Sequence, residues 1–181
     1  MTEQQQQMLE ACKRGDRNAQ REMYEHFKGK MFVVCLRYAE TRTDAEDLLQ
    51  EGFIKVFRDL HQFRGEGSFE GWIRRVMVNV ALQQIRQRKK ALDFTELDGQ
   101  EYKLGEEDPV FETGEETAKG LLKLMQKMPL GFRTVLNLYV LENYSHQQIA
   151  EELGISVGTS KSQLNRAKAH LKNMLEKNLA G

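Results

Sequence analysis

The residues best suited to a specific chemistry lie in the C-terminal part of the chain, between positions 156 and 168. Hydroxyl, amide and basic side chains recur there at helical spacing: Thr159, Lys161, Ser162, Asn165 and Arg166. Arginine and asparagine can each form two hydrogen bonds to a base edge in the major groove, while lysine and serine suit phosphate oxygens. The pattern indicates binding of duplex DNA, provided that one element presents these side chains together.

The surrounding sequence predicts such an element, a helix-turn-helix. Ser145 and Gln148 form a capping box for a short first helix. Gly154 can adopt the left-handed backbone of a sharp turn, and Ser156 caps a second helix that would enter the major groove. Ser160 stands where such a helix normally presents an apolar residue to the core. A buried hydroxyl there could bond back to its own helix, and we expect some local destabilisation. A plain helical hairpin is the alternative, disfavoured by the few acidic residues nearby.

A second candidate surface lies on the helix predicted after Thr43, which forms a capping box with Glu46. Its apolar positions step by three and four residues and predict one buried face: Ala45, Leu48, Leu49, Gly52, Phe53, Val56, Phe57 and Leu60. Its polar stripe gathers Asp47, Gln50 and Glu51. That stripe is either a solvated acidic face or a docking surface for a basic partner helix.

A third candidate surface follows at positions 63–91, where a loop with two glycines leads into a predicted helix from Ser68. Residues 52–91 carry nine basic and three acidic residues. Aromatic side chains interleaved with basic ones suit single-stranded DNA, whose unpaired bases can stack or enter pockets. Taken alone, Trp72 would belong to a core and the loop 64–68 would be an ordinary turn.

The chain has 181 residues and a formal net charge of zero, but its charge is segregated. Residues 1–91 have a net charge of +4, residues 92–117 of −9 and residues 118–181 of +5. Two basic blocks favour a polyanionic partner. Residues 92–112 have no sustained period and read as an extended acidic linker.

The fold class expected is all-α, with two small helical domains at 1–91 and 113–181 joined by the flexible linker 92–112. Asp16 is the expected N-cap of another helix in the first domain, after Gly15. In the second domain Thr113 and Glu116 form a capping box, Pro129 stops that helix or opens the next, and 132–141 form an amphipathic segment.

Composition and spacing exclude several classes of protein. Apolar runs are too short for a membrane span, and the N-terminus lacks the pattern of a signal peptide. Two cysteines form no disulfide framework and four histidines fall at no metal-ligand spacing, so we expect a cytoplasmic protein without metal or cofactor. The loop at Gly65 lacks the lysine and hydroxyl residue of a phosphate-binding loop, so no catalytic residue or small-molecule substrate is assigned.

Three motifs in this order resemble the extracytoplasmic-function (ECF) group of sigma-70 type RNA polymerase sigma factors. They are Asp-Ala-Glu-Asp-Leu-x-Gln-Glu from Asp44, Phe-Arg-Gly…Phe-x-x-Trp-Ile-x-Arg…Asn from Phe63, and Met-Pro…Arg-x-Val-Leu…Ile-Ala-Glu…Gly-Thr-x-Lys-Ser from Met128. The resemblance implies a sigma2-like helical bundle and a sigma4-like helix-turn-helix. It implies a non-enzymatic subunit that directs promoter-specific initiation.

The resemblance also implies roles for single residues. Asp47, Gln50 and Glu51 match positions that dock on the clamp helices of the largest subunit of core RNA polymerase. Positions matching contacts to the proximal, minus-ten promoter element are Arg64, Ser68, Phe69, Trp72, Arg75, Asn79, Gln83 and Arg86. Positions matching the distal, minus-thirty-five element are Thr159, Lys161, Ser162, Asn165 and Arg166. The acidic linker matches a segment in the polymerase channel, and an anti-sigma factor is an implied partner.

Two departures from the family pattern carry expectations of their own. Ser160 and Gln163 replace the usual apolar and basic residues of the recognition helix, which leaves the distal-element preference open. Housekeeping sigma factors have an aromatic-rich surface for melting DNA, whereas this sequence has the single Trp72, preceded by Gly71. The smaller stacking area should make the opening of DNA harder, so we expect stringent promoter dependence. The rival readings are a stand-alone helix-turn-helix regulator, which would need a dimer interface, and an enzyme acting on nucleic acid.

Overall fold

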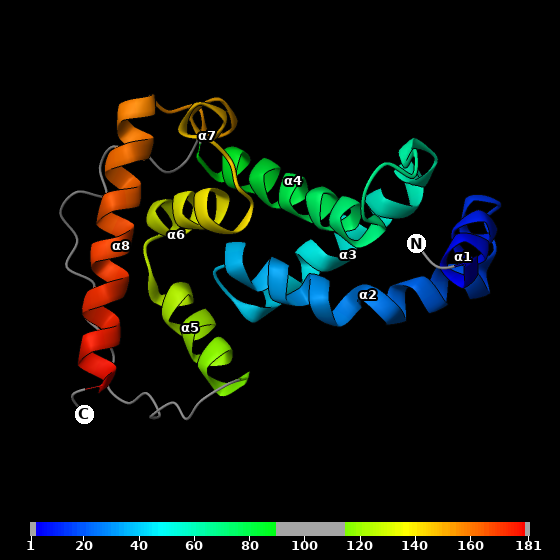
Figure 1. Ribbon diagram of the computed structural model, residues 1–181, viewed down its shortest axis with the longest axis horizontal. Helices are drawn as coiled ribbons and strands as arrows, with labels where there is room; N and C mark the ends of the chain where they lie inside the picture. Colours follow the sequence, from blue (N-terminus) through cyan, green and yellow to red (C-terminus); the bar gives the residue numbers. More distant parts are fainter. Residues whose placement is uncertain (1–2, 90–114, 180–181) are drawn as a thin grey trace. The chain divides into compact units, whose positions relative to one another are not determined.

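The structure, a computed structural model, describes the backbone of residues 3–89 and 115–179, and all of the elements in these ranges are helical (Figure 1). The all-α prediction is therefore confirmed. The described helices form two compact units, Met1–Gln84 and Ile85–Gly181. The predicted linker 92–112 and the capping residue Thr113 lie outside the described residues.

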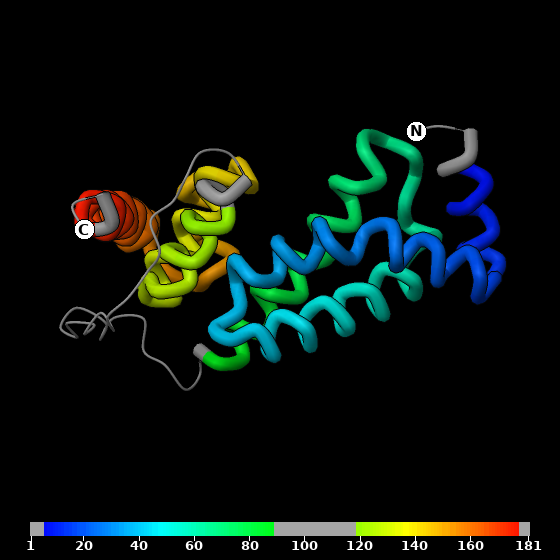
Figure 2. The backbone as a smooth tube through the Cα atoms, turned by 90° about the horizontal axis from the view of Figure 1, so that it is seen from below, coloured from blue at the N-terminus to red at the C-terminus, as the bar shows by residue number. Residues whose placement is uncertain are grey.

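The first unit contains three long helices and one shorter one. Its elements are α1 (Glu3–Lys13), α2 (Arg17–Tyr38), α3 (Arg42–Asp59), the 3₁₀ turn η1 (Leu60–Gln62) and α4 (Phe69–Lys89), of which the residues from Ile85 onward belong to the second unit. Asp16 caps α2 by accepting from the backbone N–H groups of Asn18 and Ala19, as predicted. Helices α2 and α3 run antiparallel, side by side (Figure 2). They enclose a core with α4 that is built from methionine, phenylalanine and aliphatic side chains.

The start of α3 differs from the prediction by two residues. Thr41, and not Thr43, is the N-cap, and it forms the capping box with Asp44. Both Thr41 and Thr43 have an acidic residue three positions later, so the sequence pattern fits either start. With the earlier start, Arg42 is the first residue of the helix, and its Nε donates to Glu46 Oε1 at 3.0 Å. The Glu46 side chain, which was expected to form the capping box with Thr43, is engaged in this contact instead.

The second unit consists of α5 (Glu115–Lys127), α6 (Leu130–Leu136), the π-helical turn η2 (Asn137–Leu141), α7 (His146–Leu153) and α8 (Val157–Leu179). Pro129 is the N-cap residue of α6, as the sequence predicts. Arg133 is only 1% exposed, and its Nη1 donates to the carbonyl of Gln126 at 3.2 Å near the C-terminal end of α5. A cation placed there meets the negative end of that helix, which favours its burial.

The amphipathic segment predicted over 132–141 is helical throughout, but its helical period changes within the segment. Helix α6 ends at Leu136 and the chain widens into η2. The wider turn adds a residue and shifts the register. Tyr139 and Val140 consequently lie on the surface, 39% and 51% exposed, although Leu138 is fully buried.

Candidate functional site

The acidic stripe of α3 is a continuous exposed face. Asp47, Gln50 and Glu51 are all exposed, whereas the stepped apolar positions predicted for the same helix are buried or half-buried. The spacing of three and four residues places these three side chains on one side of a rigid helix. The structure therefore brings together the three residues predicted for docking.

Ile54 extends this face and was missed by sequence reasoning. Its side chain is 68% exposed, more than any other large apolar residue that the structure describes. It follows Gln50 by four residues and Glu51 by three, so it shares their face. The sequence did contain a signal for its exposure, because Ile54 is an apolar residue that does not belong to the stepped apolar series on the buried face of α3. An exposed isoleucine beside acidic groups suits a partner that offers both basic and apolar side chains.

Glu51 is also tied to α4. The side-chain amide of Gln84 donates through Nε2 to Glu51 Oε2 at 2.7 Å. Gln84 is half-buried and neutral, so the carboxylate keeps its negative charge while its position is restrained. The acidic face and α4 are thus connected by a direct side-chain contact within the first unit.

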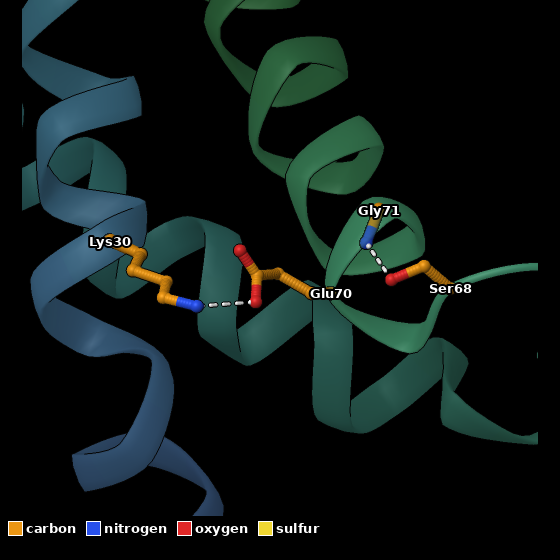
Figure 3. A network of polar contacts seen from close by, with 4 residues as sticks. All are labelled: Lys30, Ser68, Glu70 and Gly71. Carbon is orange, nitrogen blue, oxygen red and sulfur yellow. Dashed lines mark hydrogen bonds and ion pairs between the residues drawn. The ribbon is translucent and has the colours of Figure 1, made fainter. Parts of the chain in front are cut away.

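The loop before α4 is shaped by two glycines. Gly65 and Gly67 have φ of 79° and 82°, a left-handed backbone that favours glycine. Figure 3 shows how the chain is anchored where the loop ends: Ser68 Oγ accepts from the Gly71 backbone N–H at 3.3 Å. Arg64 and Ser68 are both exposed, so the loop presents a basic and a hydroxyl side chain to solvent.

Glu70, in the first turn of α4, attaches this region to α2. Lys30 Nζ lies 2.7 Å from Glu70 Oε2 (Figure 3). Both side chains are largely exposed, so the ion pair contributes little stability by itself. A carboxylate at this helix start also complements the helix dipole.

An aromatic cluster packs where the two ends of the loop meet the helices. Phe69 is 6% exposed, and its ring lies 5.0 Å from that of Phe63 and 5.7 Å from that of Phe27, measured between centroids. Trp72 stacks on Phe69 at 6.0 Å and 11° and is half-buried. The structure therefore places Phe69 in the core, while Trp72 keeps part of its ring on the surface.

The remaining residues predicted for the proximal element form a stripe along α4. Arg75, Asn79 and Gln83 are exposed at intervals of four residues, and Arg86 is exposed one turn further on. The opposite side of this helix carries the buried Ile73. A basic and amide-bearing stripe on a rigid helix suits contact with nucleic-acid backbone and bases.

The helix-turn-helix is present as predicted. Ser145 and Gln148 form the capping box of α7, and Gly154 ends it with φ of 61°. Ser156 begins α8 by accepting at Oγ from the Thr159 backbone N–H at 2.9 Å. The Thr159 hydroxyl lies 2.8 Å from Ser156 Oγ, so this side chain takes part in the cap.

The predicted base-reading positions share the outer face of α8. Lys161, Ser162, Asn165 and Arg166 are exposed, and Lys168 extends the basic character by a further half turn. Ser162 Oγ donates to the carbonyl of Thr159 at 3.0 Å. The arrangement offers an amide and three cations to a groove of duplex DNA.

The buried hydroxyl of Ser160 has its partner in the other helix of the motif. Ser160 is fully buried, and its Oγ lies 2.9 Å from Nδ1 of His146 on α7. The expected back-bond is replaced by this contact because α7 presents an imidazole at hydrogen-bonding distance. The His146 ring also stacks on Tyr139 at 4.7 Å, and Lys168 Nζ lies 5.9 Å from the Tyr139 centroid. This polar seam joins η2, α7 and α8.

Other chemistries find no support in the described ranges. No group of three or more histidine, cysteine, aspartate or glutamate side chains there could hold a metal ion. Within those same ranges, none of the helices has both the length and the apolar character needed to cross a membrane. Cys12 and Cys35 are buried free thiols, and burial is the main cause that raises their pKa to about 11 and about 12.

Comparison with known proteins assigns two regions of this chain to one family. The family model for Sigma-70 region 2 matches residues 23–91, and that for Sigma-70, region 4 matches residues 119–171. Among curated proteins, the RNA polymerase sigma-H factor of Pseudomonas aeruginosa is 27% identical over 96% of this chain and 95% of its own length. The ECF RNA polymerase sigma factor SigW of Bacillus subtilis is 29% identical over 92% of this chain and 94% of its own length.

A solved structure agrees at the level of the fold. The sigma factor RpoE from Bartonella quintana, in complex with the anti-sigma factor NepR, matches with a TM-score of 0.51 and 17% identity. The match covers 86% of this chain and 96% of that one. The family is identified by the two family models, which match the acidic-faced bundle and the helix-turn-helix and together cover more than half of the chain, and the curated sigma factors agree with it. The chain belongs to the ECF group of the sigma-70 family of RNA polymerase sigma factors, non-catalytic subunits that direct transcription initiation.

Proposed function

We propose that the first domain docks on core RNA polymerase through the acidic face of α3, with Asp47, Gln50 and Glu51 against the clamp helices of the largest subunit. The exposure of all three side chains on one rigid helix supports this assignment. Ile54 adds an apolar contact at the same face. Charge complementarity would guide the encounter, and burial of the isoleucine would slow dissociation.

The proximal, minus-ten element is captured as single strand by the loop 64–68 and by α4. In this proposal Arg64, Ser68 and Asn79 hold a flipped base above the buried Phe69. Promoter DNA runs along the stripe of α4: Trp72, Arg75, Gln83 and Arg86. Trapping of extruded bases favours melting without nucleotide hydrolysis, because binding energy offsets the cost of unstacking.

The distal, minus-thirty-five element is read as duplex by α8. Arg166 and Asn165 are suited to base edges, and Lys161 and Ser162 to phosphates or bases. Thr159 stands at the first turn, where its backbone is fixed by the Ser156 cap. Two modest DNA-binding modules on one chain gain affinity through effective concentration.

The domain boundaries proposed are 1–91 for the docking and proximal-element domain, 92–112 for the acidic linker in the polymerase channel, and 113–181 for the distal-element domain. The family-model matches support two separate functional regions. An anti-sigma factor is proposed as a further partner, on the precedent of the solved complex of RpoE with NepR. The protein would act in the cytoplasm, where core polymerase works.

The observation that carries the proposal is that one chain presents an exposed acidic helix face and two separate cationic helix faces. The test is a charge reversal, Asp47→Lys with Glu51→Lys, in the full-length protein. Co-purification with sigma-free core polymerase should be lost, while circular dichroism shows that the helices are retained.

The matched control is Glu22→Lys with Glu40→Lys, which changes the net charge equally at two exposed positions outside the α3 face. This control should bind core polymerase like the unaltered protein. Equal loss in both double variants would assign the effect to overall charge and contradict the docking face. Retained binding in the Asp47 and Glu51 variant would contradict it directly.

A further inference from the structure

A single hydrogen bond connects the acidic face of α3 with the helix proposed to carry promoter DNA. Gln84 Nε2 on α4 lies 2.7 Å from Glu51 Oε2 on α3. The two residues are 33 positions apart in the sequence, so the contact exists only in the folded first unit. A glutamine and a glutamate at such a distance carry no pairing signal in the sequence.

The geometry restrains one carboxylate of the docking face. A glutamate side chain on an exposed helix face samples several rotamers, and a partner that requires one of them must select it. Gln84 engages one carboxylate oxygen and leaves Oε1 as an acceptor for another donor. Because Gln84 is half-buried, its own side chain is partly fixed by packing before it donates.

The chemistry of the donor matters as much as its position. A lysine or arginine at position 84 could also hold Glu51, but its positive charge would cancel the charge that a basic partner recognises. The glutamine amide donates a hydrogen bond and adds no charge. The pair therefore presents a restrained carboxylate whose charge is not offset by its donor.

We propose that Gln84 is a positioning residue that preorganises Glu51 for binding to core RNA polymerase. The inference rests on the proposed docking function of the α3 face, and adds to it a residue from α4 that does not itself touch the polymerase. Gln84 follows Gln83 directly, so the same helix would contact promoter DNA and hold the docking carboxylate.

The test is a double-mutant cycle on the full-length protein. Equilibrium binding to sigma-free core polymerase is measured for the unaltered protein, Gln84→Leu, Glu51→Ala and the double variant. Gln84→Leu should raise the dissociation constant about three- to tenfold, the size expected for the net contribution of one ordinary hydrogen bond between surface side chains. In the Glu51→Ala background the same substitution should change binding less than twofold. Gln84→Asn keeps a polar amide, but its side chain is one methylene shorter and does not reach Glu51. It should raise the dissociation constant as much as Gln84→Leu, which would assign the effect to the lost hydrogen bond and not to the lost polarity.

Gln87→Leu is the matched control, since it makes the same substitution at an exposed position three residues further along α4. It should leave core binding unchanged. An equal effect of Gln84→Leu with and without Glu51 would overturn the positioning role, because the residue would then act by another route. Normal binding by Gln84→Leu would overturn it as well.

Failure of the inference and failure of the proposed function give different results. If Glu51→Ala weakens core binding while Gln84→Leu does not, the docking face stands and the positioning role falls. If Glu51→Ala binds core polymerase normally, the docking assignment of Glu51 falls, and the role of Gln84 falls with it.

Discussion

The backbone of α3 at Gly52 lies directly against the side chain of Met77 on α4, and a β-carbon at position 52 would overlap the Met77 sulfur. Both residues are buried. This contact lies between the helix with the proposed docking face and the helix with the proposed promoter face. It explains why glycine occurs within a series of otherwise apolar positions.

Gly52→Ala is therefore expected to destabilise the first unit. Met77 is 0% exposed, so its thioether has no open space to move into, and overpacking of a filled core costs about 1–3 kcal/mol. That cost exceeds the ~0.5–1 kcal/mol that alanine gains over glycine in a helix. Unfolding by urea can be followed by the fluorescence of Trp72, the only tryptophan of the chain, which packs in the aromatic cluster of this unit.

Gly29→Ala on α2 provides the control, because a β-carbon there would meet nothing within 4 Å. That variant should be stabilised by about 0.5–1 kcal/mol. If Gly52→Ala were stabilised to the same extent, the close approach of α3 and α4 would be wrong.

The contact between His146 and Ser160 predicts an asymmetric pair of substitutions. His146→Ala leaves a fully buried hydroxyl without its imidazole partner, at a cost of about 1–3 kcal/mol. Ser160→Ala should cost less, because the half-buried His146 can reach water. Amide hydrogen exchange of α7 and α8 reports the change locally.

The double variant separates the hydrogen bond from the stacking of His146 on Tyr139. His146→Ala should be less costly when Ser160 is already alanine, since no orphaned hydroxyl remains. Identical costs in both backgrounds would show that the imidazole contributes through stacking alone.

The buried thiols predict slow chemical modification of the native protein. Burial, aided by the negative charges of Asp16 and Glu22, raises the Cys12 pKa to about 11, and burial raises the Cys35 pKa to about 12, from an ordinary 9.0. Only the thiolate reacts, so at pH 8 labelling of the native protein should be slower than labelling in denaturant by roughly a hundredfold at Cys12 and roughly a thousandfold at Cys35.

The raised pKa values of the two thiols also make the stability of the protein depend on pH. Each thiol has a higher pKa in the folded than in the unfolded protein. The contribution of the neutral thiols to the free energy of unfolding is therefore complete below pH 9 and is lost as the pH rises towards 11 and 12.

The rate of labelling of the two thiols is measured with a disulfide-exchange reagent whose reaction is followed by absorbance. Rapid modification of both thiols at pH 8 without denaturant would contradict their burial.

Local sequence signals predicted the helices and several caps because capping depends on neighbours in the chain. Ser145 with Gln148, Asp16 and Gly154 all behave as their residue types indicate. Thr43 failed because Thr41 offers the same local pattern two residues earlier. Where two local solutions compete, the sequence alone does not decide between them.

The exposed faces of the candidate site were also predictable, since helical spacing determines which side chains share a side. What the sequence could not supply were contacts between helices. The bond from Gln84 to Glu51, the partner of Ser160 and the burial of Phe69 each depend on packing between elements. The π-helical turn that exposes Tyr139 is likewise a response to tertiary packing and has no clear local signature.

The two proposed promoter surfaces predict separable defects. Asn79→Ala should reduce promoter melting, measured by permanganate reactivity of unpaired thymines, and leave core binding intact. Arg166→Ala should weaken recognition of the distal element by about 1–3 kcal/mol if its base contact is bidentate, with melting of a saturated complex unchanged. The same defect in both variants would indicate one shared DNA surface and contradict the division of roles.

Run-off transcription tests the central claim most directly. Sigma-free core polymerase is combined with a promoter library, with and without the full-length protein, and the transcripts are sequenced. Addition of the protein should produce transcripts with defined start sites whose upstream DNA shares two sequence elements. Unchanged core activity, together with a footprint of the protein alone on duplex DNA, would contradict the account and identify a stand-alone regulator.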